Sequence, residues 1–195
     1  MHKHTGKPNI MQLSAAAFCI ALNLVGAYAA LCLKLPIYLD SVGTILAGAM
    51  LGPWYGMAAG LGGAFISGVT SDIYALYFMP SNLLTGLMAG ILFQTSLVRT
   101  WRLPIGAALL ALPGATVSGI TSAYVFGGVT SSGSSILVQL LKHLGCNLAA
   151  SAIVVQLVTE YGDRLISSAL VMVLLSCMTG EMKMRIRGGY TRGAV

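Results

Sequence analysis

Charged side chains are scarce in this chain of 195 residues. Only 11 Lys and Arg and 5 Asp and Glu occur, or 8% of the sequence, against 56% hydrophobic residues. A soluble domain has roughly a quarter of its residues charged. Because so few charges could not cover the surface of a water-soluble globule, the composition excludes one. We therefore interpret the chain as a membrane protein whose solvent is lipid.

Motifs for catalysis and for metal binding are also absent. The sequence has no HExxH, no GxSxG, no paired intramembrane aspartates and no phosphate-binding GxxxxGK[ST]. The four cysteines show no CxxC or other ligand spacing, so we interpret them as small hydrophobic residues and not as a disulfide framework or a metal site. We expect no enzymatic activity, no metal and no intrinsic cofactor.

Ion-coupled transport is disfavoured on similar grounds. Proton and sodium carriers place ionisable groups at mid-membrane depth, and often show duplicated halves. We find no internal repeat, and we interpret the central parts of the apolar runs as free of charge.

Long apolar runs are what the sequence does contain. A transmembrane helix takes about 20 apolar residues, fewer when the helix is partly enclosed by protein. The first run ends without a small-residue cleavage pattern, so it predicts a retained helix and not a signal peptide. The candidate segments are Ser14–Leu35, Tyr38–Leu51, Trp54–Thr70, Ser81–Val98, Pro104–Val125, Ile136–Val158 and Leu165–Met178.

The basic residues reduce seven segments to six spans. They cluster at the N-terminus, at Arg99 and Arg102, and at the C-terminus. If all three clusters are cytoplasmic, an even number of spans separates each pair. We expect part of Ser134–Gly145 not to cross, as a short helix or lid at the outer face. The predicted fold is an all-α membrane protein, one domain over 1–195, with six transmembrane helices and cytoplasmic tails at 1–10 and 181–195.

Polar and aromatic residues gather in the outer loops of this topology, Pro36–Asp40, Ser71–Pro80 and Gly127–Ser135. Asp40 is equally explained as a helix N-cap, and Tyr74 and Tyr77 as an interfacial aromatic belt. Together these residues predict the mouth of a ligand site. The candidate ligand-binding residues are Asp40, Asp72, Tyr74, Tyr77, Asn82, Tyr124, Lys142 and Asn147.

Small residues recur every four positions in two places. A ladder from Gly48 to Gly68 predicts close packing between helices of the same chain. In the first segment, Ala17 and Ala21 form an AxxxA pair, which fits internal packing and a partner surface equally well.

Several of these stretches resemble the substrate-binding S-components of energy-coupling factor (ECF) transporters. The similar segments are Leu39–Gly48, Leu51–Gly56, Gly127–Gly133, Asp163–Ser167 and the Ala17/Ala21 pair. The resemblance implies a six-helix subunit in the plasma membrane of a bacterium, which binds a vitamin from outside. It also implies docking through Ala17 and Ala21 on a transmembrane coupling subunit with two cytoplasmic ATPases, which use ATP and Mg.

The resemblance leaves the vitamin open. Only two tryptophans occur, Trp54 and Trp101, whereas a thiamin binder is expected to show a tryptophan-rich signature. The Gly, Ser and Thr loops favour a large, mostly neutral ligand, and cobalamin is the preferred interpretation. Pantothenate, with Lys142 or Lys34 near its carboxylate, a pyridoxine-like vitamin and riboflavin are alternatives. A stand-alone facilitator or channel, and a structural or sensory subunit without a ligand, are the alternatives of another class.

Overall fold

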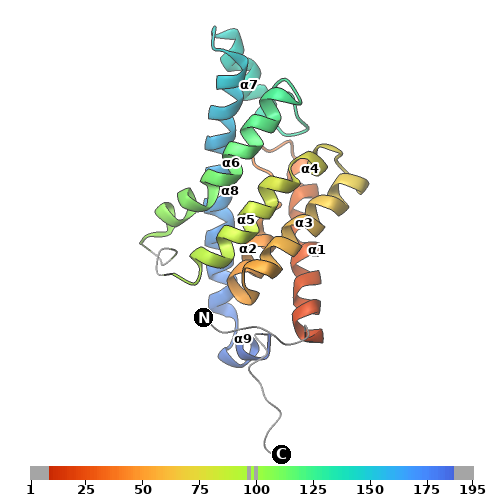
Figure 1. Ribbon diagram of the computed structural model, residues 1–195, viewed down its shortest axis with the longest axis vertical. Helices are drawn as coiled ribbons and strands as arrows, with labels where there is room; N and C mark the ends of the chain where they lie inside the picture. Colours follow the sequence, from red (N-terminus) through yellow and green to blue (C-terminus); the bar gives the residue numbers. More distant parts are fainter. Residues whose placement is uncertain (1–8, 96–97, 99–100, 187–195) are drawn as a thin grey trace, which may run out of the picture.

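A computed structural model describes residues 9–95, 98 and 101–186, and the regular structure of this part of the chain is entirely helical (Figure 1). The predicted tails 1–10 and 181–195 therefore lie largely outside the described residues, as does Arg99. The helices are α1 (Ile10–Cys32), α2 (Val42–Leu51), α3 (Pro53–Thr70), α4 (Tyr74–Tyr77), α5 (Met79–Leu92), α6 (Leu103–Tyr124), α7 (Ser134–His143), α8 (Leu148–Cys177) and α9 (Gly180–Ile186).

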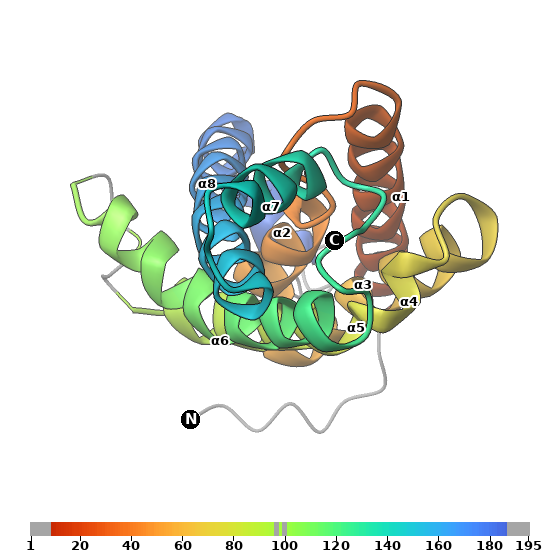
Figure 2. The same cartoon turned by 90° about the horizontal axis from the view of Figure 1, so that it is seen from above.

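Helix α2 lies at the centre of the bundle. It packs against α1, α3, α5 and α8, and Ile45 and Ala47 are completely buried. Figure 2 shows α2 between α8 on one side and α1 on the other, with α6 along the flank of α8. The bundle is therefore organised around a ten-residue helix that is almost completely enclosed by its neighbours.

The start of α2 is capped by a different helix. Asn23 of α1 is 2% exposed, and its Oδ1 accepts hydrogen bonds from the backbone N–H of Gly43 at 2.7 Å and of Thr44 at 3.2 Å. Its Nδ2 donates to Thr44 Oγ1 at 2.8 Å. These bonds satisfy first-turn amides that would otherwise be unpaired in an apolar interior. The alternative role considered for Asp40, capping α2, is therefore taken by Asn23.

Glycines let α3 and α5 touch along their backbones. A β-carbon on Gly86 would lie 2.3 Å from the Gly56 carbonyl group, and one on Gly90 would lie 2.3 Å from the Pro53 α-carbon. Gly48 of α2 faces the same two helices. The predicted internal packing of the small-residue ladder is confirmed.

Helix α8 corrects the predicted division of the C-terminal half. The sequence placed a break between Val158 and Leu165, whereas α8 runs unbroken for 30 residues. Three charged residues, Glu160, Asp163 and Arg164, mark this stretch, and they pair with one another inside the bundle and need no loop. The preceding segment is separate, because α7 covers Ser134–His143 as a short helix, as expected.

By length and composition, two of the described helices can cross a membrane, α1 and α6, or up to three if α8 and α9 form one bent span. Helices α2 and α5 are shorter apolar helices. The start of α1 and helix α9 lie at the same end of the molecule, opposite α7 (Figure 1). The six-span count and the cytoplasmic termini stay predictions.

The α3–α5 contact gives a direct test of the packing argument. We expect Gly86→Ala to lower the melting temperature, because overpacking a tight contact costs about 1–3 kcal/mol. Gly62→Ala is the matched control, since its β-carbon would meet only the flexible end of Ile20 at 2.9 Å. Both changes replace a glycine inside a helix with alanine, so both raise the intrinsic helix propensity by the same amount. Thermal unfolding of the two variants in detergent measures the difference, and equal melting temperatures would contradict the proposed contact.

Candidate ligand-binding pocket

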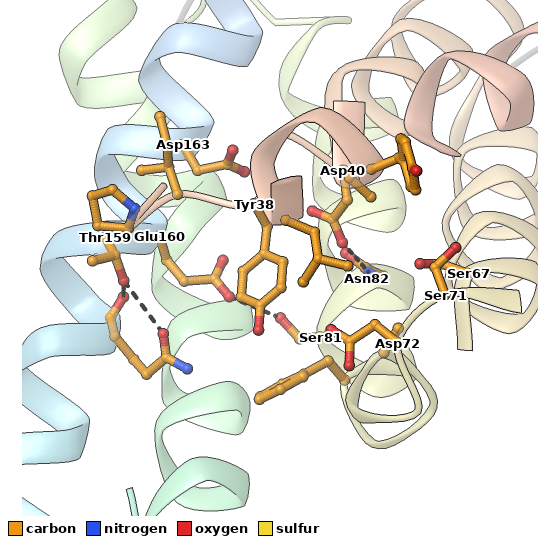
Figure 3. Close-up of a pocket in the computed structure, with 18 of the residues that line it drawn as sticks. Tyr38, Asp40, Ser67, Ser71, Asp72, Ser81, Asn82, Thr159, Glu160 and Asp163 are labelled. Atoms are coloured by element: carbon orange, nitrogen blue, oxygen red, sulfur yellow. Dashed lines mark hydrogen bonds between the residues drawn. The ribbon is translucent and has the colours of Figure 1, made fainter. Parts of the chain in front are cut away.

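A pocket opens between α1, the α1–α2 connection, the end of α3, the start of α5 and the middle of α8 (Figure 3). Its volume is about 720 Å³ when its open mouth is included. The lining residues are Ala27, Tyr28, Leu31, Pro36, Ile37, Tyr38, Asp40, Ser67, Ser71, Asp72, Ala75, Phe78, Ser81, Asn82, Gln156, Thr159, Glu160, Asp163 and Arg164.

One wall of the pocket is an ion cluster on α8. The Arg164 guanidinium, 2% exposed, contacts Glu160 Oε2 at 2.6 Å through Nη2 and Asp163 through Nη1. Glu160 and Arg164 are one helical turn apart, so they share a face of α8. The single guanidinium thus faces two carboxylates in a site that excludes most water.

Asp163 also ties α8 to the α1–α2 connection. Its Oδ1 accepts a hydrogen bond from the Leu39 backbone N–H at 2.9 Å, and its Oδ2 accepts one from Ser41 Oγ at 2.7 Å. Leu39 has a positive φ of 51°, which a non-glycine residue rarely adopts. The bond from Asp163 holds this residue in place, and so fixes where the next residue, Asp40, enters the pocket.

Asp40 and Asp72 form the opposite wall. Asp40 Oδ2 accepts from Asn82 Nδ2 at 3.0 Å (Figure 3). Asp72 accepts from the Tyr74 backbone N–H at 3.1 Å and from Ser131 Oγ. Their partners are neutral groups, in contrast to those of the α8 carboxylates.

Two ionisable groups of the α1–α2 connection, Tyr38 and Asp40, respond to this environment. Burial raises the pKa of the Asp40 carboxyl, the neighbouring Asp163 carboxylate adds to the rise, and Arg164 opposes it. Burial likewise raises the pKa of the Tyr38 phenol. The pocket is therefore a place where negative charge is costly when no cation is bound.

Three loops meet at the mouth of the pocket. Tyr38 Oη lies 3.3 Å from Ser131 Oγ, and the Gly133 backbone N–H donates to the Leu35 carbonyl at 3.2 Å. Ser131 also reaches Asp72, as described above. The three loops that the sequence placed together, Pro36–Asp40, Ser71–Pro80 and Gly127–Ser135, are in contact in the structure.

The structure brings three of the predicted site residues together. Asp40, Asp72 and Asn82 line the pocket. The side chains of Tyr74 and Tyr77 instead pack edge-on against Phe126, with ring centroids at 4.8 and 5.0 Å.

The remaining three predicted residues lie outside the pocket lining. Tyr124 is 78% exposed, and Lys142 is exposed at the end of α7. Asn147 caps α8, because its side chain accepts from the Ala149 backbone N–H at 3.0 Å.

Sequence reasoning missed the contribution of α8 to the site. The interpretation that apolar runs are free of charge in their centres is wrong for this helix, which carries half-buried Glu160 and buried Asp163 and Arg164 in its middle. The signal was present as polar residues at helical spacing. Gln156, Thr159, Glu160, Asp163 and Arg164 recur every three or four positions and so share one helical face.

The chain belongs to the family of substrate-specific components of ECF transporters, because the family model described as "ECF transporter, substrate-specific component" matches residues 12–175. Members of this family are the substrate-binding subunits of such transporters, and membership implies association with an ECF module. No curated protein and no solved structure matches the chain.

Arg164 provides a test of the ion cluster. We expect Arg164→Gln to lower thermal stability strongly, since breaking a buried ion pair from one side costs about 3–5 kcal/mol. Lys142→Gln removes the same charge from an exposed position and is expected to leave stability nearly unchanged. Thermal unfolding of both variants in the same detergent measures the difference in stability. If the two variants were equally stable, the ion cluster would not contribute to the stability of the fold.

Proposed function

We propose that this chain captures a vitamin or a similar micronutrient in the pocket between α1, α5 and α8. It then delivers this ligand across the plasma membrane of a bacterium by docking on a coupling subunit with two cytoplasmic ATPases. The observation that carries the proposal is the pocket itself, lined by polar groups from five segments, in a chain of this family.

The polar lining supports binding of a ligand more than passage of one. A pathway for free diffusion needs a continuous route, whereas here the groups of α8, α5 and the α1–α2 connection surround a single site. The contacts between the loops at the mouth are single hydrogen bonds, such as those of Ser131 with Tyr38 and Asp72 and of Gly133 with Leu35, and they include no ion pair in the described part of the chain. Such contacts break at little cost when a ligand enters or leaves.

Cobalamin, the ligand favoured by the neutral outer loops, gains no support from the pocket. Its corrin ring and nucleotide loop are much larger than the drug-sized ligands enclosed by sites of about 300–1,000 Å³. Pantothenate also loses its expected partners, since neither Lys34 nor Lys142 lines the pocket. A compact vitamin fits better, because even the 720 Å³ that includes the open mouth is an upper limit on the enclosed space.

Binding and transport by the purified chain test this function. Calorimetric titration with a panel of vitamins in detergent is expected to give tight one-to-one binding of one compound. The same protein in liposomes is expected to give no uptake until the coupling subunit and ATPases are added with ATP. Uptake by the chain alone would instead establish a stand-alone facilitator. If the folded protein bound none of the vitamins, a structural subunit would be favoured.

The docking surface is proposed to include Ala17 and Ala21. Both residues are exposed on α1, next to exposed Phe18 and Val25, whereas Ala16 and Cys19 on the other side of the helix are buried. Exposure of this small-residue pair leaves room for a partner helix to approach closely.

We expect Ala17→Leu and Ala21→Leu to weaken assembly with the coupling subunit while leaving ligand affinity unchanged. Co-purification with the module measures the first effect, and calorimetry of the isolated variant measures the second. Val154→Leu, at an exposed position of α8 and so outside this surface, serves as the control for added bulk. Loss of ligand binding in the alanine variants would place these residues in internal packing.

A further inference from the structure

The balance of charge around the pocket is strongly acidic. Of the ionisable acidic and basic groups that line it, four are carboxylic acids and one is a guanidinium. The carboxylic acids are Asp40, Asp72, Glu160 and Asp163, in a chain whose formal net charge is +6. Because the chain has only five acidic residues, four of them at one pocket is a concentration that its composition does not produce by itself.

The one guanidinium does not neutralise this charge. Arg164 contacts Glu160 and Asp163, so the pair of carboxylates already outnumbers it. Asp40 and Asp72 accept hydrogen bonds from Asn82, Ser131 and a backbone N–H, none of which is charged. Both carboxyl groups are half-buried, and Arg164 forms no ion pair with either of them in the described part of the chain. A partly desolvated carboxylate without such a partner is costly, and a bound cation would lower that cost.

The arrangement fits an organic cation better than a metal ion. Among the residues that the structure describes, no group of three or more His, Cys, Asp and Glu side chains could hold a metal. The carboxylates instead stand on separate walls, and Figure 3 shows Tyr38 between Glu160 on α8 and Asp40. Tyr38 and Phe78, with ring centroids 6.3 Å apart, offer aromatic surface to a planar or cationic group.

A second, independent feature points to a ligand at the same place. Gln156 is 4% exposed and lines the pocket, and its Oε1 accepts from Thr159 Oγ1 at 3.3 Å. No hydrogen bond from its amide nitrogen is found within the described part of the chain, and this nitrogen is not among the fully buried unpaired atoms, so it stays accessible from the pocket. An amide donor that is accessible in this way can be satisfied by an acceptor on a bound molecule.

We propose that the substrate of this pocket is a small organic cation, a ring compound bearing an ammonium or a quaternary nitrogen, whose positive charge is bound by Asp40 and Asp72. The ring lies against Tyr38 and Phe78, and a hydroxyl or carbonyl group of the ligand accepts from Gln156. This inference rests on the proposed function, since it names the class of ligand that the same site takes.

Matched ligands test the charge. Pyridoxamine carries an ammonium group where pyridoxine carries a hydroxyl, thiamine is a permanent cation, riboflavin is neutral and pantothenate is an anion. Calorimetry of the full chain in detergent is expected to rank the cationic compounds first, with pyridoxamine binding more tightly than pyridoxine.

Matched variants test the residues. Asp40→Asn and Asp72→Asn keep the shape and the accepting oxygen, so folding is expected to be retained and is checked by thermal unfolding. Each is expected to weaken binding of the best cationic ligand by about tenfold or more, as removal of a charged hydrogen-bond partner does. Glu181→Gln, an exposed acid on α9 outside the pocket, is expected to leave affinity unchanged.

The outcomes separate this inference from the function on which it rests. Tight binding of riboflavin or pantothenate, or unchanged affinity in both aspartate variants, overturns the charge assignment and leaves a solute-binding subunit. If the folded protein binds none of the compounds, the proposed function is overturned, and the charge assignment with it.

Discussion

The contact between Arg164 and its two carboxylate partners is the interaction on which the rest of the site depends. It allows α8 to carry three charged residues through the interior of the bundle without a break. Asp163 uses its remaining hydrogen-bonding capacity on Leu39 and Ser41, and so joins α8 to the segment that precedes α2. Without this junction, the wall that carries Tyr38 and Asp40 would have no fixed position relative to α8.

Close contact between backbones supplies the second constraint. Helices α3 and α5 meet through Gly56, Gly86 and Gly90, where no side chain separates them. Such contacts keep this half of the bundle narrow and set Asn82, at the start of α5, opposite Asp40. Helices α3 and α5 thus position polar atoms of the pocket, although they bury few polar side chains outside it.

Much of the fold could be predicted from the sequence, because hydrophobic length and small-residue spacing act locally. The segments for α1, α3 and α6 match their helices to within a few residues. The prediction failed at residues 159–164, where charged side chains indicate a loop unless a partner is known. That partner is the same helix one turn away, together with a chain segment more than 100 residues earlier, and neither is visible in hydropathy.

The residues of the site were likewise predictable only in part. Asp40, Asp72 and Asn82 were predictable because they lie at the ends of helices, where polar residues in a membrane protein stand out. Asn23 was not, since its role is to satisfy amides of another helix and nothing in its own neighbourhood marks it. Lys142 and Tyr124 show the opposite error, because polarity near an expected outer end does not say which way a side chain points.

The length of α8 has a consequence for the surroundings of the protein. Its 30 residues extend over about 45 Å at 1.5 Å per residue, well beyond the roughly 30 Å of a hydrocarbon core. If α8 and α9 form one bent span, α8 must lean or extend out of the lipid, and α9 turns away from it by 109° at one end. Packing against α6 and α2 then sets the slope of α8, and with it the depth at which a bound ligand is held.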